Sequence, residues 1–233
     1  MKFRNQIFDA MKYTLKDWKA IILLGTVLCI ASTVEELHTK NLTIHAILFI
    51  ISAVTLLFEE GYRYKIIENT IKGDNSPPLI ENIPKLMKDG FVELITLNVY
   101  ILILNGMNIL IEKFNGMKLP GMALIFFVIG YLIYSLFIAS AINKTLHGGK
   151  FLSGFNIVEI FRLYKKIGLK ESIFLIVVGA ISLNLVYSCI FDLSIFSEAT
   201  YIIDFLASFL LNPILLLFIT RLTASCGREA TRD

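Results

Sequence analysis

A chain of 233 residues that is 56% hydrophobic, with 18 phenylalanines, has more apolar residues than a soluble domain of this length needs. Its net charge is only +3, and it has no basic soluble segment interleaved with aromatic residues, so we expect no nucleic-acid partner. The apolar residues fall in long runs, and a helix of about 20 such residues crosses the roughly 30 Å hydrocarbon core of a bilayer. The sequence therefore predicts an all-α, polytopic protein of the cell membrane.

The first 18 residues have the pattern of an amphipathic helix. One face of this helix carries apolar residues, and the rest carries Asp and Lys. The apolar residues are Ile7, Phe8, Met11, Leu15 and Trp18. A basic amphipathic helix that ends in Trp suits the membrane interface, so we predict an interfacial helix over 1–18.

Six apolar runs follow, and we interpret the whole chain, 1–233, as a single integral membrane domain. The predicted spans are about 19–34, 43–60, 91–112, 120–142, 172–191 and 199–221. The amphipathic pattern recurs over 150–169, which we predict to be a second interfacial helix.

The longest hydrophilic passage, 61–90, separates the second span from the third. Residues 61–72 continue the helical pattern, and the turn signal Gly-Asp-Asn-Ser-Pro-Pro over 73–78 then ends it. Residues 79–89 are amphipathic, but Pro84 lies among them, so we expect a short or kinked interfacial segment there. We also expect Glu59, Glu60 and Glu93 to form ion pairs with Arg63, Lys65 and Lys88.

Basic residues indicate the orientation of the spans. All but three of the 22 Lys and Arg residues lie in the N-terminal segment, in 61–90, between spans four and five, or in the tail. The exceptions are Lys40, Lys113 and Lys118. By the positive-inside rule, 61–90 is a cytoplasmic loop and both termini are cytoplasmic.

The passage 61–90 also resembles a known family. It contains Gly61-Tyr62-Arg63-Tyr64-Lys65-Ile66-Ile67, then Gly73-Asp74, then Asp89-Gly90-Phe91. These residues resemble the prokaryotic multi-pass membrane family of domain of unknown function 4013. Gly148-Gly149-Lys150 and Phe161-Arg162-Leu163 fit the family's second amphipathic element, whereas Ile80-Glu81-Asn82 depart from its acidic and Trp-containing turn. The resemblance implies membership and membrane location, but no chemistry.

Polar residues inside the spans define a candidate polar path between spans three and six. Its members are Asn98, Asn105, Asn108, Asn184, Asp204 and Asn212. Polar groups are costly in lipid and therefore mark candidate sites. The alternative is that they only form hydrogen bonds between helices, each worth about 0.6 kcal/mol.

The sequence shows no catalytic or metal-binding pattern. No Ser/His/Asp order, Gly-rich phosphate loop or His-Glu-x-x-His motif occurs, and Cys29, Cys189 and Cys226 lack the spacing of a zinc site. We therefore expect no enzyme activity, no cofactor and no metal.

Three functions remain open. We favour a non-enzymatic membrane protein with a basic cytoplasmic collar that engages anionic lipid, a protein partner or a second copy of the chain. The alternatives are a small permease or channel and a membrane-embedded enzyme. The candidate interaction surface of the collar comprises Arg63, Lys65, Pro77, Pro78, Lys85 and Lys88.

Overall fold

The computed structural model describes residues 3–36, 41–114, 122–188 and 206–231, and every regular element within these ranges is helical. This confirms the predicted all-α class. The α-helices are α1 (Phe3–Lys16), α2 (Trp18–Glu36), α3 (Leu42–Lys72), α4 (Ile83–Phe114), α5 (Met122–Leu146), α6 (Ile157–Ile167), α7 (Leu169–Ser188) and α9 (Asn212–Ala230). A 3-10 helix, η1 (Phe151–Phe155), precedes α6, and a π-helical turn, η2 (Ala207–Leu211), leads into α9.

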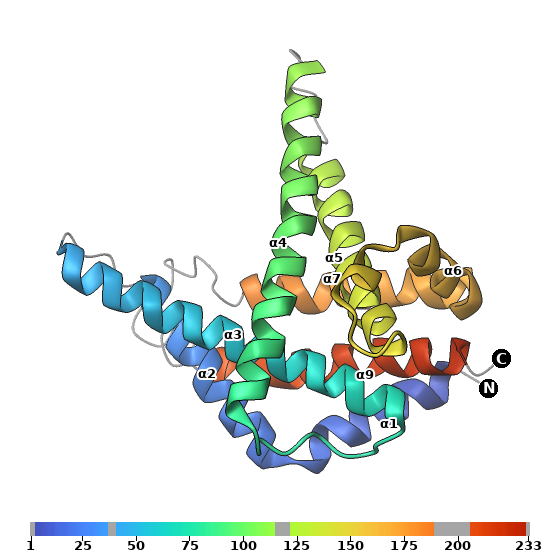
Figure 1. Cartoon of the computed structure of the whole chain (residues 1–233), viewed down its shortest axis with the longest axis horizontal. Helices are drawn as coiled ribbons and strands as arrows, with labels where there is room; N and C mark the ends of the chain where they lie inside the picture. The colour runs from blue at the N-terminus through green and yellow to red at the C-terminus, as the bar shows by residue number, and fades with distance from the viewer. Residues whose placement is uncertain (1–2, 37–40, 115–121, 189–205, 232–233) are drawn as a thin grey trace.

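Helices α3 and α9 lie at the centre of the packing. Both contribute side chains to the two largest apolar clusters, one shared with α1, α2 and α4 and the other with α5 and α6. Helix α1 runs antiparallel along α9, so the two ends of the chain lie close together (Figure 1). Helices α4 and α5 project together away from α3, α7 and α9 (Figure 1), so the described helices do not form one parallel bundle.

Helix α3 has defined caps at both ends. Asn41 is the N-cap, and its Oδ1 accepts hydrogen bonds from the backbone N–H groups of Thr43 and Ile44 at 3.0 and 3.3 Å. Gly73 ends the helix in the left-handed conformation, with φ 105°, which glycine adopts without a steric cost. The 31-residue helix therefore includes the predicted span 43–60 and its predicted extension over 61–72.

Residues 83–89 are not the separate short segment that the sequence suggested. They form the first two turns of α4, a continuous helix of 32 residues. Pro84 lies in the first turn, where its missing N–H group needs no partner, and Oδ1 of Asn82 accepts a hydrogen bond from the N–H of Lys85 at 3.0 Å. Proline blocks a helix on its N-terminal side, so here it starts α4 rather than kinking it.

The predicted interfacial helix over 150–169 divides into two elements. The 3-10 helix η1 comes first, and α6 starts after Asn156, whose Oδ1 accepts a hydrogen bond from the N–H of Glu159 at 3.3 Å. Helix α6 ends at Gly168, directly before α7.

Two helices are long and apolar enough to cross a membrane. Among the described residues they are α3 and the helix Phe209–Ala230, and a shorter apolar helix covers Trp18–Ile30. Only 6% of the most apolar 18 residues of α3 are buried, so most of this apolar stretch is partly or fully exposed. These two helices support a membrane location for the protein. The count of six spans stays a prediction.

Helices α3 and α4 cross in direct backbone contact at Gly61 and Gly90. A Cβ atom on Gly61 would overlap the carbonyl oxygen of Leu86, and a Cβ atom on Gly90 would overlap that of Leu57. Small residues allow two helix backbones to approach this closely. The two glycines therefore set the distance at which α3 and α4 pack.

A methyl group at this crossing should destabilise the fold. We expect Gly90→Ala to lower the unfolding free energy by about 1–3 kcal/mol, because the obstructing atoms are backbone and cannot rotate away. Denaturant unfolding of the purified protein in detergent, followed by circular dichroism, measures this change.

Gly106→Ala is the matched control. Gly106 is in the same helix and has no atom within 4 Å of the position of a Cβ, so this variant should be neutral or gain up to about 1 kcal/mol in helix propensity. Equal stabilities of the two variants would contradict the backbone contact.

Candidate functional site

Four charged side chains are buried together where α3, α4 and α5 meet. Glu60 and Arg63 come from α3, Glu93 comes from α4 and Lys144 comes from α5. Each is between 1% and 6% exposed. We call these four residues the charged centre. Two carboxylates balance two cations, which is the condition under which charges are tolerated away from water.

The charged centre is organised as two ion pairs. Arg63 pairs with Glu60 one turn earlier in α3, as predicted, and its guanidinium lies over the ring of Phe137 at 4.5 Å. Lys144 pairs with Glu93 and joins α5 to α4. Burial lowers the pKa of the Lys144 ammonium, and the neighbouring Glu93 carboxylate opposes this shift.

Lys144 is the member of this site that the sequence analysis missed. The sequence places its charge in the cytoplasmic loop and predicts Arg63, Lys65 and Lys88, without Lys144, as the partners of Glu59, Glu60 and Glu93. In the structure the Lys144 Nζ also donates a hydrogen bond to Thr96 Oγ1 at 3.2 Å. The sequence contains one signal for the burial of Lys144. Phe137 lies seven residues earlier, so the two side chains share one face of α5, and that face is buried.

A second buried cation, Arg221 of α9, holds several elements together. Its guanidinium donates to Oδ2 of Asp9 in α1 from Nε and Nη2, at 3.2 and 2.9 Å. It also donates to Thr70 Oγ1 at 3.1 Å, to the carbonyl oxygen of Asp74 at 2.7 Å and to Asn75 Oδ1 at 3.1 Å. All five guanidinium hydrogens are thus used, although Arg221 is only 2% exposed.

Neighbouring contacts hold the turn 73–78 in place. The Tyr62 hydroxyl donates to the carbonyl oxygen of Pro78 at 3.2 Å, and the Lys16 ammonium donates to that of Asn75 at 3.1 Å. The Tyr13 ring lies 4.4 Å from the Arg221 guanidinium. Burial raises the pKa of the Tyr13 hydroxyl, and the nearby Arg221 guanidinium opposes this shift.

The residues of the predicted interaction surface have different environments. Arg63 belongs to the charged centre, and Pro77 and Pro78 are buried. Lys85 and Lys88 are exposed, and Lys65 is half-buried. Of the six residues of this predicted surface, only the three lysines are therefore accessible at the protein surface.

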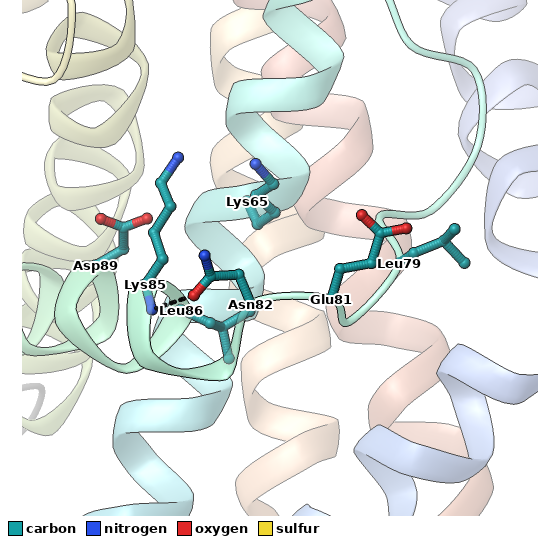
Figure 2. Close-up of a pocket in the computed structure, with 7 residues that line it drawn as sticks. All are labelled: Lys65, Leu79, Glu81, Asn82, Lys85, Leu86 and Asp89. Carbon is teal, nitrogen blue, oxygen red and sulfur yellow. Dashed lines mark hydrogen bonds between the residues drawn. The ribbon is translucent and has the colours of Figure 1, made fainter.

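Two of these lysines line a cavity of about 110 Å³ between α3, the 79–82 segment and the start of α4. We call it the loop cavity. Figure 2 shows its lining residues, which are Lys65, Leu79, Glu81, Asn82, Lys85, Leu86 and Asp89.

The candidate polar path is described only in part. Asn98 is exposed on α4, where its Nδ2 donates to the carbonyl oxygen of Leu94 at 2.8 Å, while Asn212 is buried at the start of α9. Asn105, Asn108 and Asn184 lie on helices whose side chains are not described at those positions, and Asp204 lies outside the described residues. The path therefore stays a prediction.

Every regular element in the described part of the chain is helical, and the buried charged side chains described above are paired. The family model for a protein of unknown function (DUF4013) matches residues 44–191, which is more than half of the chain. The chain therefore belongs to this family, as the resemblance indicated. No curated protein and no solved structure matches the chain.

The residues that carried the resemblance have structural roles here. Gly61 and Gly90 form the crossing of α3 and α4, Arg63 belongs to the charged centre, and Gly73 ends α3. Asp89 differs from these, because it lines the loop cavity and forms no ion pair within the part of the chain that the structure describes.

Removing one charge from the charged centre should be costly. We expect Lys144→Met to lower the unfolding free energy by about 3–5 kcal/mol, because it leaves Glu93 buried without a cation. Adding Glu93→Gln should recover much of this loss. Denaturant unfolding of both single variants and the double variant gives the coupling energy.

Lys72→Met is the control for this experiment. Lys72 pairs with Glu68 on the same helix, but its side chain is 60% exposed, so the loss should stay below about 1 kcal/mol. Equal losses for Lys72→Met and Lys144→Met would contradict the importance of burial.

Proposed function

We propose that this protein is a non-enzymatic, multi-pass protein of the cell membrane whose cytoplasmic face carries a basic amphipathic collar on an anionic leaflet. The proposal includes six spans with both termini in the cytoplasm. The observation that carries it is the outward face of α1.

Helix α1 packs against the protein with a side on which Phe3 and Ile7, a member of the predicted outward face, are half-buried. Ala10, Tyr13 and Thr14 are buried. The large apolar residues on its other side are exposed. They are Phe8 at 62%, Met11 at 48% and Leu15 at 64%, and the stripe continues to Trp18 at 63%. These positions recur every three or four residues, so they form one apolar face that suits a bilayer interface.

Cations flank this apolar face of α1. Arg4, Lys12 and Lys19 form no ion pair with any residue in the described ranges. Each basic residue held near an anionic leaflet contributes about 1 kcal/mol to membrane attraction. The apolar face and the cations together favour an anionic lipid surface over a neutral one.

Helix α6 supports the same function independently. Val158 and Phe161 are 61% and 60% exposed, and the exposed Arg162, Lys165 and Lys166 lie beside them. Two separate helices thus combine exposed large apolar side chains with exposed cations.

One observation favours the permease as a second function. The π-helical turn η2 ends directly before Asn212 and Pro213, because proline cannot donate to the preceding turn. Interrupted helices with polar residues line the substrate sites of many transporters. A solute flux in proteoliposomes that Asn212→Leu abolishes would favour this function over the collar.

Reporter fusions test the topology. We expect reporters at His38, Asn115 and Phe196 to be external, and reporters at Asn75, Lys150 and Asp233 to be cytoplasmic, because basic residues concentrate in the second set of segments. Paired phosphatase and fluorescent-protein fusions measure this. A cytoplasmic reporter at Asn115 or Phe196 would overturn the six-span arrangement.

The single tryptophan tests the collar. We expect Trp18 fluorescence in proteoliposomes to be quenched more by lipids brominated near the headgroup than by lipids brominated near the chain ends, because an interfacial helix lies at that depth. Quenching should increase when phosphatidylglycerol replaces phosphatidylcholine.

A variant with both Phe8→Asp and Leu15→Asp provides the comparison. These substitutions lie on the exposed face, so the fold should persist while the quenching falls. Unquenched emission typical of water in the unmodified protein would count against the collar.

A further inference from the structure

The loop cavity carries charges of both signs from three parts of the chain. Lys65 comes from α3, Glu81 from the segment before α4, and Lys85 and Asp89 from the first two turns of α4. Its volume of about 110 Å³ is well above the roughly 10–15 Å³ that a single water molecule needs. The cavity is therefore large enough for a small solute.

Opposite charges remain apart in this cavity, whereas they pair elsewhere in the protein. Lys72 and Glu68, four residues apart on α3, form an ion pair at 2.6 Å. Lys85 and Asp89 have the same spacing on α4, yet neither forms an ion pair with any residue in the described ranges, and the same holds for Glu81. Three charged groups of the lining are thus available to a ligand.

Two lysines from different helices line the cavity. Figure 2 shows the Lys65 and Lys85 side chains extending to the same side, with Asp89 next to Lys85 and Glu81 beside Leu79. Lys65 donates to Glu68 at 3.1 Å and keeps further ammonium hydrogens for another acceptor. Two ammonium groups in the lining of one cavity favour an anionic group of a ligand.

Asp89 supplies the complementary requirement. Burial raises the pKa of its carboxyl, with Lys85 as the strongest opposing influence. A cationic group beside Asp89 would restore favourable interactions to a carboxylate that is partly removed from water. Asn82 does not compete for this role, because its Oδ1 already caps α4.

The charged lining of the loop cavity is separate from the exposed apolar side chains at the start of α4. Ile83 and Phe91 are 55% and 56% exposed, and helical spacing places them on the face opposite Lys85 and Asp89. The charges on the cavity side favour a soluble ligand over a lipid chain.

We propose that the loop cavity binds a small zwitterion, with its carboxylate or phosphate between Lys65 and Lys85 and its ammonium at Asp89. Free amino acids and phosphoethanolamine both have this chemistry. The site goes beyond the proposed collar, since it uses neither the apolar face of α1 nor the count of spans.

Calorimetric titration of the full-length protein in detergent tests the site. The probes are glycine and O-phosphoethanolamine, with methylammonium, acetate and inorganic phosphate as singly functional comparisons. We expect at least one zwitterion to bind about tenfold more tightly than each single-function probe. Binding by glycine alone indicates a carboxylate ligand, and binding by phosphoethanolamine alone indicates a phosphate ligand.

Two variants then locate the binding site. Lys85→Ala and Asp89→Asn should each weaken zwitterion binding by about tenfold. Lys88→Ala is the matched control, because Lys88 is an exposed lysine of α4 that does not line the cavity, and binding should persist.

Equal binding of zwitterions and single-function probes would overturn the proposal, as would no binding of either zwitterion. The comparison among ligands uses the unmodified protein, so it decides the matter even if a variant fails to fold. Equal weakening by Lys88→Ala would place any binding outside the loop cavity.

Discussion

The backbone contact between Gly61 and Gly90 is the constraint on which the rest of this structure depends. It sets the separation of α3 and α4, the two longest described helices. Glu60 adjoins the first glycine, and Glu93 lies three residues after the second. The close crossing therefore brings two carboxylates to one level of the fold, where Arg63 and Lys144 balance them. Wider spacing would separate these charges and admit water.

Two buried arrangements of charge extend this constraint through the fold. The charged centre joins α3, α4 and α5, while Arg221 joins α9 to α1, α3 and the turn after α3. In both cases hydrogen bonds or opposite charges offset the cost of removing a cation from water. The turn 73–78 is therefore fixed on its inner side, and the adjoining segment leads into the loop cavity at a defined position.

The surface charges of the described residues occur in two arrangements. On α1 and α6, exposed cations accompany exposed large apolar side chains, a combination that suits an anionic bilayer surface. In the loop cavity, cations and carboxylates occur together but remain unpaired within the described residues, a combination that suits a solute with both charges. The apolar stripes lie on α1 and α6, whereas the cavity is lined by α3, the 79–82 segment and α4.

The sequence by itself determined the helical class, the extension of α3 to Lys72, the turn at 73–78 and the amphipathic character of α1. These features follow from local periodicity and turn chemistry, which a short window of residues contains. Only the tertiary structure decided that Glu93 pairs with Lys144, 51 residues away, and that Asp9 binds Arg221, 212 residues away. It also buried Pro77 and Pro78 and packed Ile7, from the predicted outward face of α1, against a core cluster. These pairings and burials depend on which helix faces pack against each other, and that packing involves residues far apart in the sequence.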